Sequence, residues 1–170
     1  MPRVIAMMNQ KGGVGKTTSA VNLAAALAAT GKRVCLIDLD PQAHMTLHVG
    51  LDPDEIDCTV YDLFTDSERS AKDAVVRVDE RLDAIVSETD LAAAESELAQ
   101  HDDRQHILAR AFAPIADRYD VVMIDCPPSL GVLTINALSM ADEVIVPMQA
   151  HFLALQGVGK LLETVGLVCQ

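Results

Sequence analysis

The chain has 170 residues, a formal net charge of -12 and a hydrophobic fraction of 50%. This length and hydrophobicity favour one folded domain with its own core and exclude a disordered chain. Most of the acidic residues lie between Asp52 and Asp117. One interpretation is that these charges only solvate helix faces. The other is that they form a surface that repels phosphate backbones, which makes this stretch a poor candidate for nucleic-acid binding.

The first half of the chain begins with two apolar segments that are separated by a helical pattern. Arg3–Met8 and Arg33–Asp38 are short apolar runs of the kind that form buried strands. The apolar spacing within Lys16–Thr30 predicts a helix that ends at Gly31. Pro41 then enforces a turn after the second strand.

Strands and helices alternate through the rest of the chain. From Gln42 to Asp79 the pattern is least regular, with short helices predicted near Val60–Phe64 and Ala71–Val76. The remaining predicted strands are Leu82–Val86, Asp120–Asp125 and Glu143–Pro147, and the helices are Leu91–Gln100, Arg104–Arg118, Leu133–Ala141 and Gln156–Val168. The predicted fold class is therefore α/β: one domain, residues 1–170, with a doubly wound, mostly parallel sheet and helices on both faces.

The cysteines and the apolar runs predict a cytoplasmic protein without a membrane partner. Cys35, Cys58, Cys126 and Cys169 form no Cys-x-x-Cys pair, and three of them lie in strongly apolar surroundings, as expected of reduced, buried thiols. No secretory signal precedes the first strand, and no apolar run approaches the ~20 residues of a membrane span.

A Gly-rich loop lies between the first predicted strand and the first predicted helix. Gly12, Gly13 and Gly15 allow the backbone to curl so that its N–H groups point inward, and the start of the helix adds its positive dipole end. Lys16 would place a positive charge on the β- and γ-phosphates of a nucleotide, and Thr17 would offer a hydroxyl to Mg²⁺. A chance Gly-rich turn is the alternative, which the strand–loop–helix context disfavours.

The loop departs from the usual Gly-x-x-x-x-Gly-Lys-Ser/Thr pattern. Gln10 stands where that pattern has its first glycine, and a second lysine, Lys11, comes next. Taken alone, Lys11 could equally be a solvated surface lysine. The loop reads Lys-Gly-Gly-x-Gly-Lys-Thr-Thr, and in this form it resembles the deviant Walker A ATPases: ParA/Soj partition proteins, MinD and the nitrogenase iron protein.

Further segments extend this resemblance. Val34–Gln42 and Asp125–Gly131 look like the second acidic segment and the switch II segment of the family. The segments that are similar to the ParA/Soj branch specifically are Leu91–Glu95, Asn136–Leu138, Pro147–Gln149 and Ala154–Gly157. The sequence departs from the family pattern at His151, where the family has an acidic residue. Relatives continue with further strands and helices beyond the position of Gln170, so we expect a chain that lacks the C-terminal third.

The resemblance implies that the chain binds ATP with Mg²⁺ and hydrolyses ATP to ADP and phosphate. The nucleotide would be held by Gly12, Gly13, Val14, Gly15, Lys16, Thr17 and Thr18. Lys16 would contact the phosphates, Asp40 would position the attacking water, and Lys11 would reach across a dimer to the partner's nucleotide; these are the three catalytic residues. Thr17, Asp38 and Asp125 would form the metal site.

Each of the three acids also has a structural interpretation. Asp40, before Pro41, could be only a turn residue, and Asp38 and Asp125 could cap N–H groups at strand ends. All three follow predicted strands, however, and ligands of open α/β sheets gather at the carboxyl ends of strands. This position favours a function for all three.

The resemblance also implies a biological role. The chain would be an ATP-dependent dimerising switch for chromosome or plasmid partition, a homodimer with ATP that acts with a centromere-binding ParB-like protein. Non-specific DNA binding and a nucleoid location are expected of the full-length family, but the basic region that would carry them is absent from this segment. Alternatives are the positioning of another intracellular cargo, a redox or metabolic enzyme of the same superfamily, and a nucleotide binder without turnover.

Overall fold

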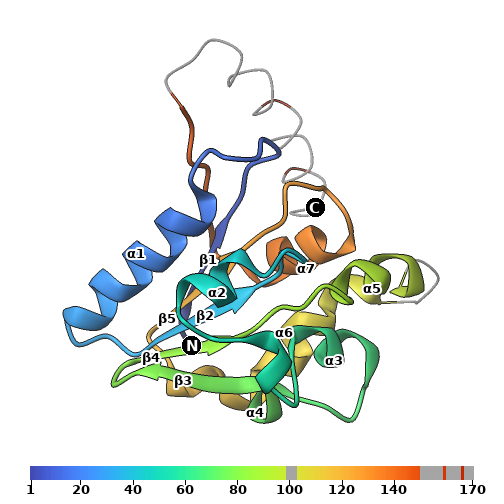
Figure 1. Ribbon diagram of the computed structural model, residues 1–170, viewed down its shortest axis with the longest axis horizontal. Coiled ribbons are helices and arrows are strands. Elements are labelled where there is room, and N and C mark those ends of the chain that lie inside the picture. The colour runs from blue at the N-terminus through green and yellow to red at the C-terminus, as the bar shows by residue number, and fades with distance from the viewer. Residues whose placement is uncertain (99–102, 150–158, 160–165, 167–170) are drawn as a thin grey trace.

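The computed structural model describes residues 1–98, 103–149, 159 and 166 (Figure 1). Its sheet has six strands in the order β3-β4-β2-β5-β1-β6, and every neighbouring pair is parallel except β3 and β4. The strands are β1 (Arg3–Met7), β2 (Val34–Asp38), β3 (Val75–Asp79), β4 (Leu82–Ile85), β5 (Val121–Asp125) and β6 (Glu143–Ile145). The predicted α/β class with a mostly parallel sheet is confirmed.

Helices cover both faces of the sheet. They are α1 (Lys16–Ala29), α2 (His44–His48), α3 (Val60–Thr65), α4 (Ala71–Ala74), α5 (Leu91–Glu97), α6 (Ile107–Phe112) and α7 (Val132–Met140), with 3-10 turns at η1 (Pro53–Glu55), η3 (Arg104–His106) and η4 (Ala113–Arg118). On one face, Ala20 and Ala24 of α1 pack against Met7 and Leu36. The other face is covered by α3 to α7, and Figure 1 shows α1 apart from these helices, across the sheet.

The strand β3 is absent from the sequence-based prediction, which extended a helix to Val76. In the structure α4 ends at Ala74, and Val75–Asp79 pairs antiparallel with β4 at the edge of the sheet. The helical prediction was wrong there because the β-branched residues of the segment fit a pleated edge strand better than a helix. The pairing that stabilises this strand is tertiary and has no local signal.

The predicted helix Arg104–Arg118 is divided into three parts. Pro114 lacks the backbone N–H that would continue α6, so the α-helix ends at Phe112 and a 3-10 segment follows. The short helix α2 was not predicted, because it spans only five residues of an irregular stretch. Of the predicted helix Gln156–Val168, only Gly159 and Gly166 are described, both as helical; Ala154–Gly157, His151 and Cys169 lie outside the described residues.

The helices of the described ranges are all too short or too polar to cross a membrane.

The packing of α6, η3 and α7 depends on one buried amide. Asn136 of α7 donates to the carbonyls of Arg104 and Val132 at 2.7 and 2.9 Å and accepts from the N–H of Leu108 at 3.1 Å. These bonds satisfy a backbone donor at the start of α6, so Asn136 joins α6, η3 and α7 into one layer.

We expect Asn136→Ala to lower the free energy of unfolding by about 2–3 kcal/mol, because the Leu108 N–H loses its acceptor while still buried. Urea unfolding measures the change. Asn22→Ala is the matched control, since the Asn22 amide bonds to the Thr18 carbonyl on the exposed side of α1. Equal losses in the two variants would contradict the role given to Asn136.

Candidate functional site

The Gly-rich loop connects β1 to α1 and has the backbone conformation that its glycines predict. Gly13 and Gly15 have φ angles of +72° and +90°, in the left-handed region that side chains rarely adopt, and Gly15 is the N-cap of α1. A Cβ atom at Gly12 would meet no atom within 4 Å. Gly13 and Gly15 are therefore required by conformation, whereas Gly12 stands in open space.

One hydrogen bond joins the start of α1 to the end of β5. The Thr17 hydroxyl donates to Oδ2 of Asp125 at 2.6 Å, and Oδ1 of the same carboxylate is buried without a partner. Burial raises the pKa of Asp125 to about 6, while the Thr17 hydrogen bond and the positive charge of Lys16 act in the opposite direction. The unpaired oxygen marks a place where a cation or a water molecule would be favourable.

This pair of oxygens fits Mg²⁺. Hydroxyl and carboxylate oxygens are the ligands that Mg²⁺ takes in proteins, commonly one or two carboxylates together with nucleotide phosphates. Within the described ranges, no group of three or more His, Cys, Asp or Glu side chains lies close enough to hold a metal alone. A cation at Thr17 and Asp125 would therefore depend on phosphate oxygens, which the adjacent loop is built to receive.

A cleft of about 860 Å³ opens beside the loop, within the size range of small-molecule sites. Its walls come from the loop and the start of α1, from the segment after β2 with α2, from α5, and from the segment after β5. The lining residues are Gly12, Gly13, Gly15, Lys16, Thr17, Thr18, Asp40, Pro41, Gln42, His44, His48, Ala92, Pro127 and Pro128. The structure thus brings most of the predicted nucleotide-binding residues together with Asp40.

Asp40 forms the turn that its place before Pro41 predicts, and it also lies at the cleft. Its carboxylate accepts from the N–H of Gln42 at 3.0 Å, and its carbonyl accepts from the N–H of Ala43 at 2.9 Å, which closes a turn around Pro41. The same residue lines the cleft. The turn therefore fixes Asp40 at the edge of the site.

Asp38 is fully buried and does not line the cleft. Its carboxylate accepts from the N–H and hydroxyl of Thr46 at 3.0 and 2.8 Å and from the N–H of Asp40 at 3.1 Å. Burial raises the pKa of Asp38 to about 7, and the hydrogen bonds from Thr46 act against that shift. Asp38 thereby holds α2 and the Asp40 turn against the sheet, and its assignment to the metal remains a prediction.

Thr46 extends this network to the next strand. Its hydroxyl also accepts from the N–H of Ser87, just beyond β4, at 3.0 Å. The sequence analysis missed Thr46, because nothing in its spacing shows that α2 returns it to the end of β2. It also missed His44 and His48, which α2 places one turn apart on the cleft wall.

Lys11 lies outside the cleft of its own chain. Its side chain is exposed, and its ammonium donates to the Gln149 side chain at 3.3 Å. Gln149 in turn donates to the Gly13 carbonyl at 3.4 Å, and the Asn9 side chain bonds to the Lys11 N–H and the Pro147 carbonyl. The loop and the segment after β6 therefore hold one another, while Lys11 does not line the cleft.

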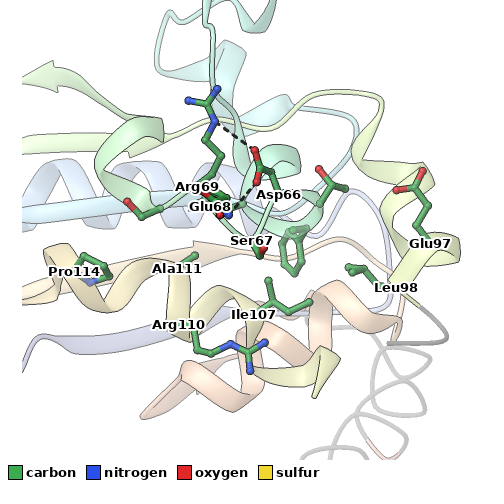
Figure 2. A pocket seen from close by; sticks show the side chains of 14 residues that line it. Asp66, Ser67, Glu68, Arg69, Glu97, Leu98, Ile107, Arg110, Ala111 and Pro114 are labelled. Atoms are coloured by element: carbon green, nitrogen blue, oxygen red, sulfur yellow. Dashed lines mark hydrogen bonds and ion pairs between the residues drawn. The ribbon is translucent and has the colours of Figure 1, made fainter. Parts of the chain in front are cut away.

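A second cavity of about 570 Å³ lies between the end of α3 and α6 (Figure 2). Figure 2 shows the ion pair between Asp66 and Arg69 at this cavity, 3.7 Å long. Its lining also includes Glu68 and Glu97 but no glycine. The lining holds these three carboxylates and the guanidinium groups of Arg69 and Arg110, but no Gly-rich loop. The cavity beside the Gly-rich loop is therefore the better candidate for a triphosphate.

Comparison with known proteins identifies the family of the chain. A family model described as an AAA domain matches residues 2–170. The sporulation initiation inhibitor protein Soj of Bacillus subtilis is 46% identical over 168 residues, which cover 99% of this chain and 66% of Soj. The chromosome partitioning protein ParA of Myxococcus xanthus is 44% identical over 169 residues, covering 99% of this chain and 59% of that protein. The chain belongs to the ParA/Soj family.

Solved structures with the same fold contain bound nucleotides. A Mycobacterium smegmatis protein described as cobyrinic acid a,c-diamide synthase, with bound ATP analogue and magnesium, has a TM-score of 0.92 and 45% identity, covering 99% of this chain and 68% of its own. A putative plasmid partition protein from Borrelia burgdorferi, bound to AMPPNP, has a TM-score of 0.87 and 30% identity, covering 99% and 72%. This ParA/Soj chain spans 59–66% of the length of these two curated relatives and 68–72% of the length of these two solved structures.

The raised pKa of Asp125 predicts how stability depends on pH in this ParA/Soj chain. Between the ordinary pKa of 3.8 and the folded value of about 6, the folded chain keeps a proton that the unfolded chain has lost, so the free energy of unfolding falls as pH rises. Asp125→Asn removes this cost. We expect the variant without nucleotide to be more stable than wild type by about 1–2 kcal/mol at pH 7.5 and equally stable at pH 4.

Urea unfolding at several pH values measures this difference. Asp120→Asn is a control of opposite sign, because the hydrogen bond and charge of Arg33 hold the pKa of Asp120 below its usual value. Stability from that pair is present above pH 3.8 and is lost as the pH falls further, so the variant should be less stable at pH 7.5. A destabilised Asp125→Asn at pH 7.5 would show that the burial cost is not there.

Proposed function

We propose that this chain is the nucleotide-binding domain of an ATP-dependent dimerising switch ATPase for chromosome or plasmid partition. The observation that carries the proposal is the Thr17–Asp125 hydrogen bond of 2.6 Å beside the Gly-rich loop, with the second Asp125 oxygen buried and unpaired. A structure of 45% identity and the same fold contains an ATP analogue and magnesium, which supports ATP and Mg²⁺ as the ligands of this site.

The residues of the cleft divide the chemistry between them. The loop amides and Lys16 hold the phosphates, and Thr17 and Asp125 hold Mg²⁺. Bound Mg²⁺ supplies charge neutralisation for the phosphates. Asp40, fixed by its turn at the cleft wall, orients the attacking water. Phosphoryl transfer needs positioning and charge stabilisation rather than covalent chemistry, and these residues provide both.

Lys11 makes hydrolysis conditional on a second copy of the chain. Its side chain is exposed and lies outside the cleft of its own chain. Gln149 holds the ammonium group there by a single long hydrogen bond of 3.3 Å. When two chains face each other across their nucleotides, Lys11 reaches the partner's phosphates and adds positive charge there, as an arginine finger does. The open space at Gly12 gives the facing backbone room to approach.

The relatives indicate what such a switch would serve. Soj and ParA homologues at 44–46% identity are named for the inhibition of sporulation initiation and for chromosome partitioning. We include in the proposal a ParB-like partner and a cytoplasmic, nucleoid-associated location for the whole protein. The net charge of -12 disfavours DNA binding by the segment described, so we assign no DNA surface to it. The positioning of another cargo by the same cycle remains an alternative.

A metabolic enzyme is the second candidate, because a structure with 45% identity is described as cobyrinic acid a,c-diamide synthase. The two functions differ in what stimulates ATP turnover. An amide synthase would hydrolyse ATP faster when cobyrinic acid and an ammonia source are added. A partition switch would respond to a centromere-binding partner and DNA instead.

Light scattering after size exclusion tests the switch. With a slowly hydrolysed ATP analogue and Mg²⁺, the wild-type chain should double its mass from the 18.2 kDa of one chain, and with ADP it should remain single. We expect Lys11→Ala to weaken the dimer by at least about tenfold, since the partner's phosphates lose a positive charge. Labelled nucleotide bound to each sample shows that the sites are filled.

Two further variants sharpen this result. Lys72→Ala removes an exposed lysine far from the loop and should dimerise as wild type does. Gly12→Val adds a side chain in space that is empty in the single chain, so the variant should not dimerise even in samples whose labelled nucleotide shows a filled site. A nucleotide-loaded single chain in every wild-type sample would reject the switch for residues 1–170.

A further inference from the structure

Two segments that are distant in the sequence meet beside the nucleotide cleft. Glu95 of α5 lies against Gly131, which is the N-cap of α7. A Cβ atom at Gly131 would overlap Oε1 of Glu95 and would lie 2.7 Å from its Cδ and 3.2 Å from its Oε2. The carboxyl group therefore occupies the space that a side chain at position 131 would need.

Gly131 is required here by space and not by backbone conformation. Its φ and ψ of -89° and -167° are extended values that any residue adopts. The three atoms nearest to such a Cβ all belong to the Glu95 carboxyl group. Because this group is the end of a flexible side chain, an alanine at position 131 would displace it without unfolding the chain.

The Glu95 carboxyl group sits at the N-terminal end of a nine-residue helix. Its Oε1 atom is buried and has no hydrogen-bond partner among the described residues. The first N–H groups of a helix have no partner within the helix, and they carry its positive dipole end. A carboxylate at this place is attracted to α7 without being bonded to one fixed donor.

The same two elements form one wall of the cleft. Ala92 of α5 lines the cleft together with Pro127 and Pro128, which lie between Asp125 and Gly131. The carbonyl of Ser129 accepts from the Thr134 hydroxyl at 2.7 Å, so this segment moves with the start of α7. In contrast, α5 is fixed to the core by its buried residues Leu91, Ala94 and Leu98.

We propose that Glu95 is a positioning residue of the nucleotide site, which holds residues 126–131 against α5 by its contact with Gly131. This inference rests on the proposed ATP hydrolysis. Asp125 immediately precedes the segment that Glu95 holds, and Pro127 and Pro128 of that segment line the cleft. Loss of the contact leaves the phosphate-binding loop intact but loosens the wall that follows the Asp125 carboxylate.

Four variants test the proposal: Glu95→Ala, Gly131→Ala, the double variant, and Glu97→Ala, which removes an exposed carboxylate from the same helix. Hydrogen exchange of the backbone amides of residues 129–135 is measured without nucleotide. Glu95→Ala and Gly131→Ala should each raise the exchange rate about tenfold, because both remove the contact. The double variant should be no faster than either single variant, as expected for two residues that share one interaction.

Steady-state kinetics provide the second measurement. Glu95→Ala should lower kcat about tenfold while the affinity for ADP changes by less than about threefold, since the loop still binds the diphosphate. Glu97→Ala should match wild type in both measurements. Unchanged exchange in Glu95→Ala, or additive effects in the double variant, would overturn the proposal. If wild type does not hydrolyse ATP, the proposed function fails, and the exchange rates alone decide on Glu95.

Discussion

The hydrogen bond from Thr17 to Asp125 is the interaction on which the rest of the site depends. It connects the first turn of α1 to the end of β5, and these two elements meet because β1 and β5 are parallel neighbours with Met7 opposite Asp125. The Gly-rich loop leaves β1 at that same edge and returns into α1, so the phosphate site and the carboxylate are held by one piece of sheet. The remaining walls of the cleft come from segments that follow β2, β4 and β5 at the same edge.

This arrangement gathers negative charge in a buried place. Asp38 and Asp125 end adjacent strands in register and are both almost fully buried, which raises the pKa of each well above its usual value. Asp38 is compensated by three hydrogen bonds, whereas Asp125 keeps one oxygen unpaired. The unpaired oxygen therefore leaves an electrostatic cost at Asp125 in the folded chain, and a cation bound there with nucleotide would offset it. Under the proposed function, the nucleotide and its cation would stabilise the site that holds them.

The parts of the site that the sequence predicted are those with a local cause. The positive φ angles of Gly13 and Gly15 and the start of α1 at Lys16 follow from residues that are adjacent in the chain. Asp125 could be placed because it ends an apolar strand. Thr46, by contrast, reaches Asp38 only through the unpredicted helix α2, and β3 forms only because β4 offers an edge. The contact of Glu95 with Gly131 joins two segments that the sequence analysis recognised separately, but their meeting depends on how α5 and α7 pack on the same face.

The most direct test of this account is the Mg²⁺ dependence of nucleotide binding, measured by titration calorimetry with a slowly hydrolysed ATP analogue. The ATP analogue would be titrated into wild type and into a variant carrying both Thr17→Val and Asp125→Ala, each once in the presence of Mg²⁺ and once in the presence of EDTA. The account predicts that EDTA weakens binding to wild type at least about tenfold and leaves the weaker binding of the double variant nearly unchanged, because the two residues hold the cation. Wild-type affinity that is the same in EDTA, or a double variant that keeps the full Mg²⁺ effect, would contradict it.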